Sequence, residues 1–265
     1  MRRLFSSVGS RLPVPAAALT LTLALAGCGG SGAGTTVGSV PSATAGAQAV
    51  RGAAPGTAHA GSASPSASAP ARLPGLGPRT LAEIPDNARQ VLIVTGKGKN
   101  SPQSQVVLYQ RSDDDGWAVG QTWAAHNALK GWTDHHYAGD LHSPIGVFTL
   151  SDAGGLLADP GTKLPYDRSG SFTIGGTGFE GEPLAGSFDY VVAIDYNREP
   201  GTSPLDWTRP LGANRGGGIW LHVDHGGPTH GCVSLAPQHM KELLRTLDPA
   251  LHPVIAMGDR TSLER

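Results

Sequence analysis

In the C-terminal two thirds of the chain, hydrophobic residues occur in short runs separated by glycine, proline and polar residues. The runs are too short for most helices and are rich in valine, isoleucine and aromatic residues, a pattern typical of strands. An Asp-Gly pair at Asp115 and Gly116 separates two of the runs and indicates a hairpin turn. The expected strands are 91–95, 105–110, 117–123, 144–150, 188–196 and 253–257.

One segment near the C-terminus has the period of a helix instead. Its apolar residues stand at positions i, i+3, i+4 and i+7, which places them on one helical face. Pro237 suits a first helical turn, and Pro249 ends the pattern. Many short strands with one helix and long loops predict a mainly β domain, a sandwich or a partly closed sheet. The residues of the helical face are Met240, Leu243, Leu244 and Leu247.

The long loops are expected at 126–142, 151–187 and 197–217, with one short strand at 171–174. Loops of this length inside a compact domain are often functional. Adjacent His135 and His136 in the first loop are expected to be an exposed polar pair rather than metal ligands, since neighbouring side chains point apart.

The segment 218–235 carries the densest group of chemically active residues. Ile219, Leu221 and Val223 alternate with polar or aromatic residues, as in a half-buried strand. The Gly-Gly-Pro sequence at 226–228 is expected to break this strand and turn the chain back. The returning segment would bring Cys232 within hydrogen-bond reach of His222.

A cysteine and a histidine in this arrangement form a nucleophile and its base. The imidazole accepts the thiol proton, because the thiolate is the reactive form of cysteine. Gly231 leaves space beside the sulfur, and the N–H groups of Gly231 and Cys232 would face a developing oxyanion.

The sequence Thr229-His230-Gly231-Cys232, with His222 upstream, resembles the signature of the L,D-transpeptidase (YkuD-type) catalytic domain. A second element, 143–150, resembles the Thr/Ser-Pro-x-Gly-x-Phe segment of that family. The resemblance covers roughly residues 88 to 258. His222 stands ten residues before Cys232, a spacing typical of a short-loop branch. Ser234 stands where the family often has asparagine or arginine, which bears on substrate preference.

The resemblance implies a β-sandwich whose cleft holds the cysteine–histidine pair and an enzyme that cross-links peptidoglycan stem peptides. Cys232 and His222 would be nucleophile and base, with His230 and Gly231 completing the catalytic group. The substrate-binding candidates are Thr229, Ser234 and Arg215, of which Arg215 would pair with a substrate carboxylate. No cofactor or metal is implied.

Other functions use the same residues. If water replaces the acceptor amine, the enzyme is an L,D-carboxypeptidase. A different cysteine peptidase would take its base from His239 or His252, after the cysteine. A non-catalytic lipoprotein would use His222, His225, His230 and Cys232 as zinc ligands. A degenerate module would bind the wall without turning it over.

The N-terminal part of the chain predicts export and anchoring. Residues 1–27 combine arginines with a short apolar run, as in a secretory signal. The sequence Leu-Ala-Gly before Cys28 resembles a bacterial lipoprotein signal, so Cys28 is expected to be acylated and not to form a disulfide with Cys232. Residues 28–75 are mostly Gly, Ala, Ser, Thr and Pro, the composition of a flexible tether.

We therefore expect three regions: a signal peptide at 1–27, a tether at 28–75 and a catalytic domain at 76–265. The protein would be held at the cell membrane by lipid, outside the cytoplasm and facing the cell wall. Its formal net charge of −1 gives no indication of a nucleic-acid partner.

Overall fold

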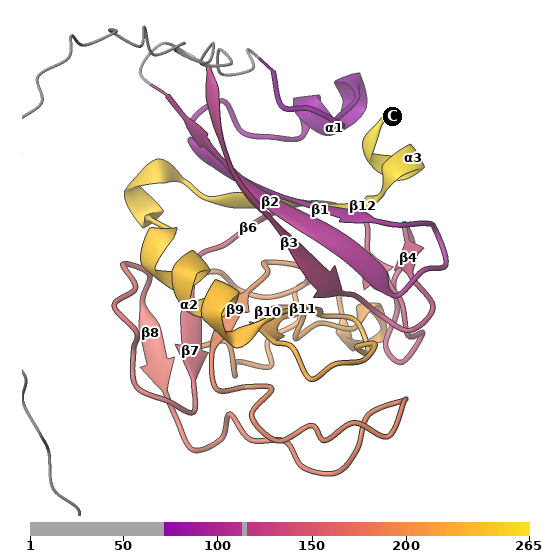
Figure 1. The fold of residues 1–265 in the computed structure, drawn as a ribbon, viewed down its shortest axis with the longest axis vertical. Coiled ribbons are helices and arrows are strands. Elements are labelled where there is room, and N and C mark those ends of the chain that lie inside the picture. Colours follow the sequence, from indigo (N-terminus) through magenta and orange to yellow (C-terminus); the bar gives the residue numbers. More distant parts are fainter. Residues whose placement is uncertain (1–71, 113–115) are drawn as a thin grey trace, which may run out of the picture. The chain divides into compact units, whose positions relative to one another are not determined.

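The computed structural model describes residues 72–112 and 116–265. In this part of the chain one large sheet has the strand order β6-β12-β1-β2-β3-β11-β10-β9-β7-β8, and β4 pairs with β5 apart from it (Figure 1). The prediction of a mainly β fold with long loops is confirmed. The expected signal peptide, Cys28 and nearly all of the tether lie outside the described residues.

The strands are β1 (Gln90–Gly96), β2 (Gln103–Arg111), β3 (Trp117–His126), β4 (Trp132–Thr133), β5 (Ser143–Pro144), β6 (Gly146–Thr149), β7 (Ala153–Gly155), β8 (Tyr166–Arg168), β9 (Val191–Ala193), β10 (Trp220–Val223), β11 (Val233–Leu235) and β12 (Val254–Asp259). The helices are α1 (Pro78–Ala82), α2 (Pro237–Thr246) and α3 (Arg260–Leu263), with 3-10 turns at Ala213–Arg215 and Pro249–Leu251.

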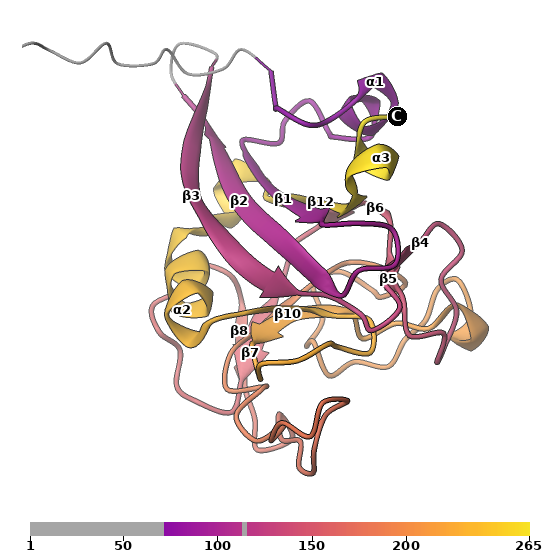
Figure 2. The same ribbon diagram turned by 45° about the vertical axis from the view of Figure 1, so that its right-hand side comes forward.

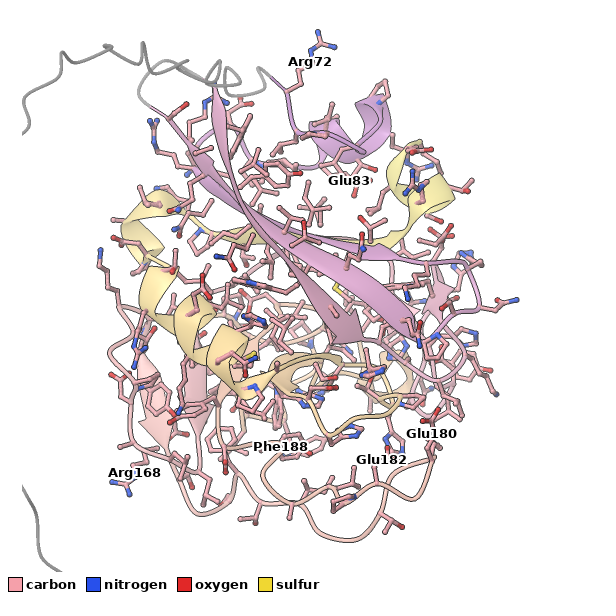
Figure 3. All side chains as sticks on the ribbon, in the orientation of Figure 1. Arg72, Glu83, Arg168, Glu180, Glu182 and Phe188 are labelled. Atoms are coloured by element: carbon pink, nitrogen blue, oxygen red, sulfur yellow. The ribbon has the colours of Figure 1, made fainter. Side chains whose placement is uncertain are left out.

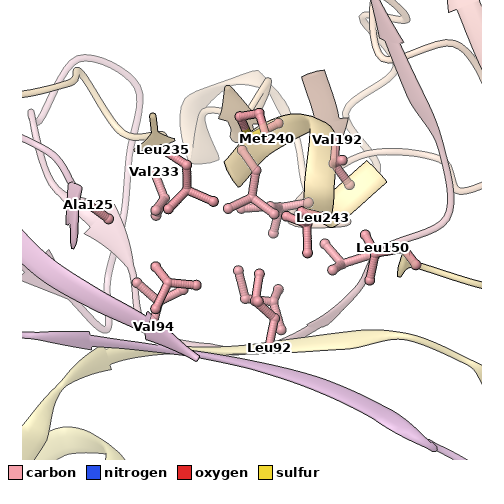
Figure 4. Packing of buried hydrophobic residues seen from close by; sticks show 14 of the residues in the cluster. Leu92, Val94, Ala125, Leu150, Val192, Val233, Leu235, Met240 and Leu243 are labelled. Carbon is pink, nitrogen blue, oxygen red and sulfur yellow. The ribbon is translucent and has the colours of Figure 1, made fainter. Parts of the chain in front are cut away.

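The main core lies between the two halves of the curled sheet. Leu92 and Val94 of β1 face Val233 and Leu235 of β11 across it, and α2 contributes Met240 and Leu243 (Figure 4). The helix buries its predicted face completely, with Leu247 just beyond its end also at 0% exposure. Burial of such aliphatic side chains contributes about 1.5–3 kcal/mol each and holds the two halves together.

A second core covers the other face of β1 and β12. Val91 and Ile93 alternate with the core residues of β1 and pack in this second cluster with Leu73 and Leu263. Both faces of β1 are therefore buried, which explains its uninterrupted apolar sequence. Figures 1 and 2 show α1 and α3 side by side over this face. Because Leu73 is 5% exposed, packing begins slightly before the expected boundary at 76.

The loop 151–187 differs from its prediction. It contains two short parallel strands, β7 and β8, and none at 171–174. Phe172 is nevertheless 1% exposed, so the apolar residues there fill space without a ladder partner. The strand expected at 188–196 is shorter in the structure, because only residues 191–193 pair with neighbouring strands, and these form β9. No helix in the described ranges has the length and apolar character needed to cross a membrane.

Candidate active site

The predicted strand around His222 is β10, and its neighbour is β11. The expected turn-back is wrong in one respect: β10 and β11 are parallel, with His222 opposite Ser234 and Leu221 opposite Val233. The chain between them loops back past the start of β10 before β11 begins, which gives β11 a new antiparallel partner in β3. The register puts Leu221 and Val233 in the core and leaves the other face of the pair for the site.

Cys232 lies immediately before β11, beside Trp220. The backbone N–H of Trp220 donates to Sγ at 3.4 Å, and Sγ lies 3.7 Å from the carbonyl oxygen of Gly218. The carbonyl oxygen of Cys232 accepts hydrogen bonds from Thr229 at 2.6 Å and from Ser143 at 3.4 Å. These contacts fix the backbone on both sides of the sulfur, and Ser143 opens the second family-like segment.

His222 is almost completely buried, with 3% of its surface exposed. Its Nδ1 lies 2.9 Å from the carbonyl oxygen of Val223. A carbonyl only accepts, so Nδ1 carries the ring proton, and Nε2 is the ring nitrogen left to accept another. Backbone contacts with Val223 and Ser187 favour the charged ring, but burial outweighs them. The ring packs edge-on against Phe188 at 5.5 Å and parallel to His225 at 5.8 Å, which fixes its orientation.

His222 and Cys232 line one small cavity of about 110 Å³. Burial lowers the pKa of His222 to about 4 and raises the pKa of Cys232 to about 11. At neutral pH the resting pair is therefore an uncharged imidazole and a thiol. Among residues 72–112 and 116–265, no hydrogen bond joins Sγ of Cys232 to the ring of His222, so the expected contact is not made in the resting structure. Proton transfer from the thiol would then accompany attack on a substrate, without a preformed thiolate.

Two backbone donors beside the sulfur are free. In the described residues, the N–H groups of Gly231 and Cys232 make no hydrogen bond. Gly231 is buried, and a Cβ on it would lie 3.0 Å from Ile219 and 3.5 Å from the carbonyl oxygen of His142. A larger residue would have to displace the Ile219 side chain, so glycine suits this close packing beside the proposed oxyanion site.

Cys232 also borders a second, larger cavity of about 360 Å³ on its other side. His230 and Gly231 line it together with loop residues from 136–141 and 207–218. The loop 126–142 thus reaches the candidate site. Cys232 and His230 are shared by the two cavities, so the sulfur stands at their junction.

The remaining predicted site residues have different surroundings. His230 is exposed, and its ring lies 4.6 Å from that of Phe179. Thr229 and Ser234 are buried, and their hydroxyls donate to the Cys232 carbonyl and to Asp224 Oδ1 respectively. Arg215 lines neither cavity; its carbonyl oxygen accepts a hydrogen bond from Tyr196.

A group of residues behind the site was not expected from the sequence. Asp224 accepts hydrogen bonds from Ser234 at 2.6 Å and from His126 at 2.8 Å. On the other side, His225 lies 3.2 Å from Glu182. Figure 3 shows Glu182 and Phe188 at the end of the domain away from Arg72 and Glu83. Sequence distance hid His126, at the end of β3, and Glu182, in the loop 151–187.

His136 is buried, contrary to the expected exposed pair, while His135 is exposed. Its Nδ1 lies 3.0 Å from Asp140 Oδ1, and the residue lines the larger cavity. Desolvation lowers the pKa of His136, so its ring is neutral at neutral pH. The buried partner Asp140, four residues on, is the signal that could have distinguished the two histidines.

The alternative bases and ligands are placed elsewhere. His239 stacks on Trp123 at 5.2 Å, and neither His239 nor His252 lines a cavity with Cys232. Within residues 72–112 and 116–265, no three His, Cys, Asp or Glu side chains are grouped so that they could share a metal ion. The site therefore gives no support to the zinc alternative.

Comparison with known proteins completes the description. Residues 86–255 match the family model of the L,D-transpeptidase catalytic domain (YkuD). No curated protein matches the chain. Crystal structures of the helical cell shape determining protein Pgp2 from Campylobacter jejuni and of a lysine-to-alanine variant are similar at 15% identity, with TM-scores of 0.38 and 0.37. Each alignment covers 66% of this chain and 49% or 48% of the other, so this chain spans about half their length. The family match covers well over half of the sequence, and the chain belongs to the L,D-transpeptidase (YkuD) catalytic domain family.

Proposed function

We propose that the chain is a peptidoglycan L,D-transpeptidase in which Cys232 is the nucleophile and His222 is its base. The observation that supports this most directly is the cavity that the two residues share, where Val223 engages Nδ1 of His222 and leaves Nε2 as the nitrogen that can accept the thiol proton. The family match supplies the substrate class, the stem peptides of the cell wall.

In the first step, Sγ of Cys232 attacks the carbonyl carbon at the L-centre of the diamino acid in a tetrapeptide stem. The thiol proton passes to Nε2 of His222, and the carbonyl oxygen becomes an oxyanion facing the N–H groups of Gly231 and Cys232. The intermediate collapses when His222 gives the proton to the leaving amine. D-Alanine departs, and the stem remains on Cys232 as a thioester.

In the second step, the amine of a neighbouring stem attacks the thioester carbonyl. His222 accepts the amine proton and returns it to the sulfur, so an amide cross-link forms and the thiol is regenerated. If water attacks instead, the product is a shortened stem, and the enzyme is an L,D-carboxypeptidase. The same residues serve both reactions, and the nucleophile admitted to the thioester decides between them.

The neighbours of the pair act by positioning. Thr229 holds the Cys232 carbonyl, and Ser234 is committed to Asp224, so both support the site from within. His230, exposed at the junction of the cavities, is placed to contact the substrate. These roles refine the expectation that Thr229 and Ser234 bind substrate directly.

We also propose that acylated Cys28 anchors the catalytic domain, residues 76–265, at the membrane through the tether at 28–75. A stretch of this composition and length has an r.m.s. span of roughly 35–40 Å, which lets the domain reach a wall polymer from the lipid. The activity would then lie outside the cytoplasm.

The test is product analysis with a tetrapeptide-stem muropeptide and the full-length protein. Release of D-alanine with dimeric muropeptide supports transpeptidation, and release with monomeric tripeptide identifies the carboxypeptidase. Cys232→Ala should abolish both, and a chelator should change neither. Intact muropeptide after incubation with folded protein would refute both activities.

A further inference from the structure

The larger cavity beside Cys232 holds one residue with a permanent charge. Among its fourteen lining residues, Arg209 is the only Lys, Arg, Asp or Glu; most of the others are glycines and apolar residues. The sequence offered Arg215 for a substrate carboxylate, but the fold brings Arg209 to the cavity instead. Both arginines stand on the segment that leads to β10.

Arg209 is held firmly and has donors to spare. Its Nη1 donates to the carbonyl oxygens of Asp206 at 3.1 Å and Thr208 at 2.9 Å, and the guanidinium lies 4.9 Å from the ring centre of Trp207. In the described part of the chain, Nε and Nη2 make no hydrogen bond, and neither is fully buried. They form one edge of the guanidinium fork, the edge that binds a carboxylate with two parallel hydrogen bonds.

No acid forms a direct ion pair with this cation. Among residues 72–112 and 116–265, no carboxylate lies within 4.0 Å of the Arg209 nitrogens. The nearby Asp206 attracts the guanidinium only at longer range, and it accepts the backbone N–H of Thr208. Burial is the largest effect and lowers the pKa of the Arg209 guanidinium, with Asp206 opposing it.

The glycines under the guanidinium bring it close to the thiol. A Cβ on Gly217 would lie 2.2 Å from Nε, so only glycine allows the side chain to lie there. Nη2 is 3.6 Å from the Cβ position of Gly218, whose carbonyl oxygen is 3.7 Å from Sγ of Cys232. With standard bond lengths, the sulfur and the guanidinium are at most roughly 11 Å apart, a distance spanned by about three extended residues.

We infer that Arg209 is the specificity-determining anchor for a free carboxylate of the stem peptide bound at Cys232. This rests on the proposed function for the identity of the substrate. Two carboxylates lie within reach of a peptide whose scissile carbonyl is at the sulfur: the C-terminal carboxylate of D-alanine and the side-chain carboxylate of diaminopimelate. Arg209 selects stems that carry the bound carboxylate over stems in which it is amidated or missing.

The test measures binding, so that it does not depend on turnover. Full-length Cys232→Ala protein is titrated with a tetrapeptide stem, and Cys232→Ala/Arg209→Gln is compared with it. We expect Kd to rise about 10- to 100-fold, as for loss of a charge-assisted hydrogen bond. Arg209→Lys should recover only part of the affinity, because it keeps the charge but loses the fork. Arg215→Gln, outside the cavity lining, is the matched comparison and should change Kd less than about twofold.

Two analogues identify the carboxylate: one ends in D-alaninamide, and one has lysine in place of diaminopimelate. The analogue that lacks the bound carboxylate should bind the protein with Arg209 about as weakly as the parent peptide binds the Arg209→Gln variant. The Arg209→Gln variant should bind this analogue and the parent peptide equally. Unchanged Kd in Arg209→Gln, a loss confined to Arg215→Gln, or no binding of the tetrapeptide would overturn the inference. Failure of the proposed function would show separately, as absence of D-alanine release by protein with Cys232 intact.

Discussion

The hydroxyl of Thr229 donates a hydrogen bond to the carbonyl oxygen of Cys232, with 2.6 Å between the two oxygens. Ser143 offers the same carbonyl a longer contact of 3.4 Å. The backbone of Cys232 is thus fixed by one residue of its own motif, Thr229, and by one that is distant in sequence, Ser143. The N–H groups proposed for the oxyanion belong to the two peptides that precede this fixed carbonyl.

Replacement of Thr229 by valine keeps the shape of the side chain and removes the donor. We expect kcat to fall about tenfold or more, because the backbone next to the oxyanion donors loses the shorter of its two side-chain hydrogen bonds. The free energy of unfolding should fall by about 0.5–1.5 kcal/mol, the net contribution of one hydrogen bond, because Ser143 still donates to the carbonyl. Thr229→Ser should restore kcat, measured as D-alanine release. Normal kcat in Thr229→Val would show that the hydroxyl has no positioning role.

The pH dependence follows from the neutral resting pair. Since the pKa of His222 is about 4 and that of Cys232 about 11, His222 can accept a proton across the neutral range. We expect kcat/KM to stay level between about pH 5 and about pH 10 and to fall at lower pH as His222 becomes charged.

Alkylation of Cys232 by iodoacetamide checks the same pair without substrate. Its rate should be low at neutral pH and rise as the thiol ionises towards pH 11. The His222→Gln variant is the control for the contribution of the imidazole. A rate that is already maximal below pH 8 would show a preformed thiolate and contradict this mechanism.

Arg198 is the buried cation on which the loops around β9 depend. Its Nη1 lies 3.0 Å from Asp152 and also bonds Asp195, and its Nη2 donates to the Thr202 carbonyl at 2.7 Å. Arg198→Met should lower the free energy of unfolding by about 3–5 kcal/mol, because two buried carboxylates lose their partner. Lys163→Gln, which breaks the exposed pair with Asp248, should cost less than about 1 kcal/mol. Urea unfolding measures both, and equal losses would contradict the prediction.

The pair of His126 and Asp224 should make stability depend on pH. The hydrogen bond to Asp224 raises the pKa of His126. Burial alone would raise the pKa of Asp224, but the hydrogen bonds from His126 and Ser234 outweigh burial and lower it. The contribution of His126 to the free energy of unfolding is fully present below the pKa of an unfolded histidine and is lost as pH rises through the raised pKa of the folded state. The contribution of Asp224 is fully present above the pKa of an unfolded aspartate and is lost as pH falls through the lowered pKa of the folded state.

Both contributions are therefore largest together between about pH 4 and about pH 6.5. Asp224→Asn should lower Tm most near pH 5.5 and less near pH 9. The asparagine oxygen can still accept the hydrogen bond from Ser234, so the change removes the charge of the pair. Thermal unfolding across this range gives the comparison. A Tm difference that is constant from pH 5 to pH 9 would mean that the ion pair contributes nothing.

Local pattern was sufficient for much of the fold. The spacing of Met240, Leu243 and Leu244 predicts α2, and the apolar run in β1 predicts a buried strand. The order of β10 and β11 could not be read from the sequence, since Gly226 and Gly227 suit a hairpin as well as a loop to a parallel neighbour. Only the partner strands on either side, β9 and β3, decide between them.

The candidate site divides in the same way. His222 and Cys232 are close in sequence, and their chemistry is visible in the motif. The role of Arg209 is not visible in the sequence, because it depends on the side chain lying over Gly217 and entering the cavity. Arg215 is nearer the motif and does not line the cavity. The burial of His136 likewise depends on packing against segments that are remote in the chain.

The most direct measurement is the mass of the full-length protein after brief incubation with a tetrapeptide stem and an acid quench. We expect an adduct with the mass of the stem minus D-alanine, mapped to the peptide that contains Cys232, with one D-alanine released for each adduct formed. Cys232→Ala should show neither. A folded protein that gains no mass and releases no D-alanine, or an adduct that persists in Cys232→Ala, would contradict the claim that Cys232 is the nucleophile.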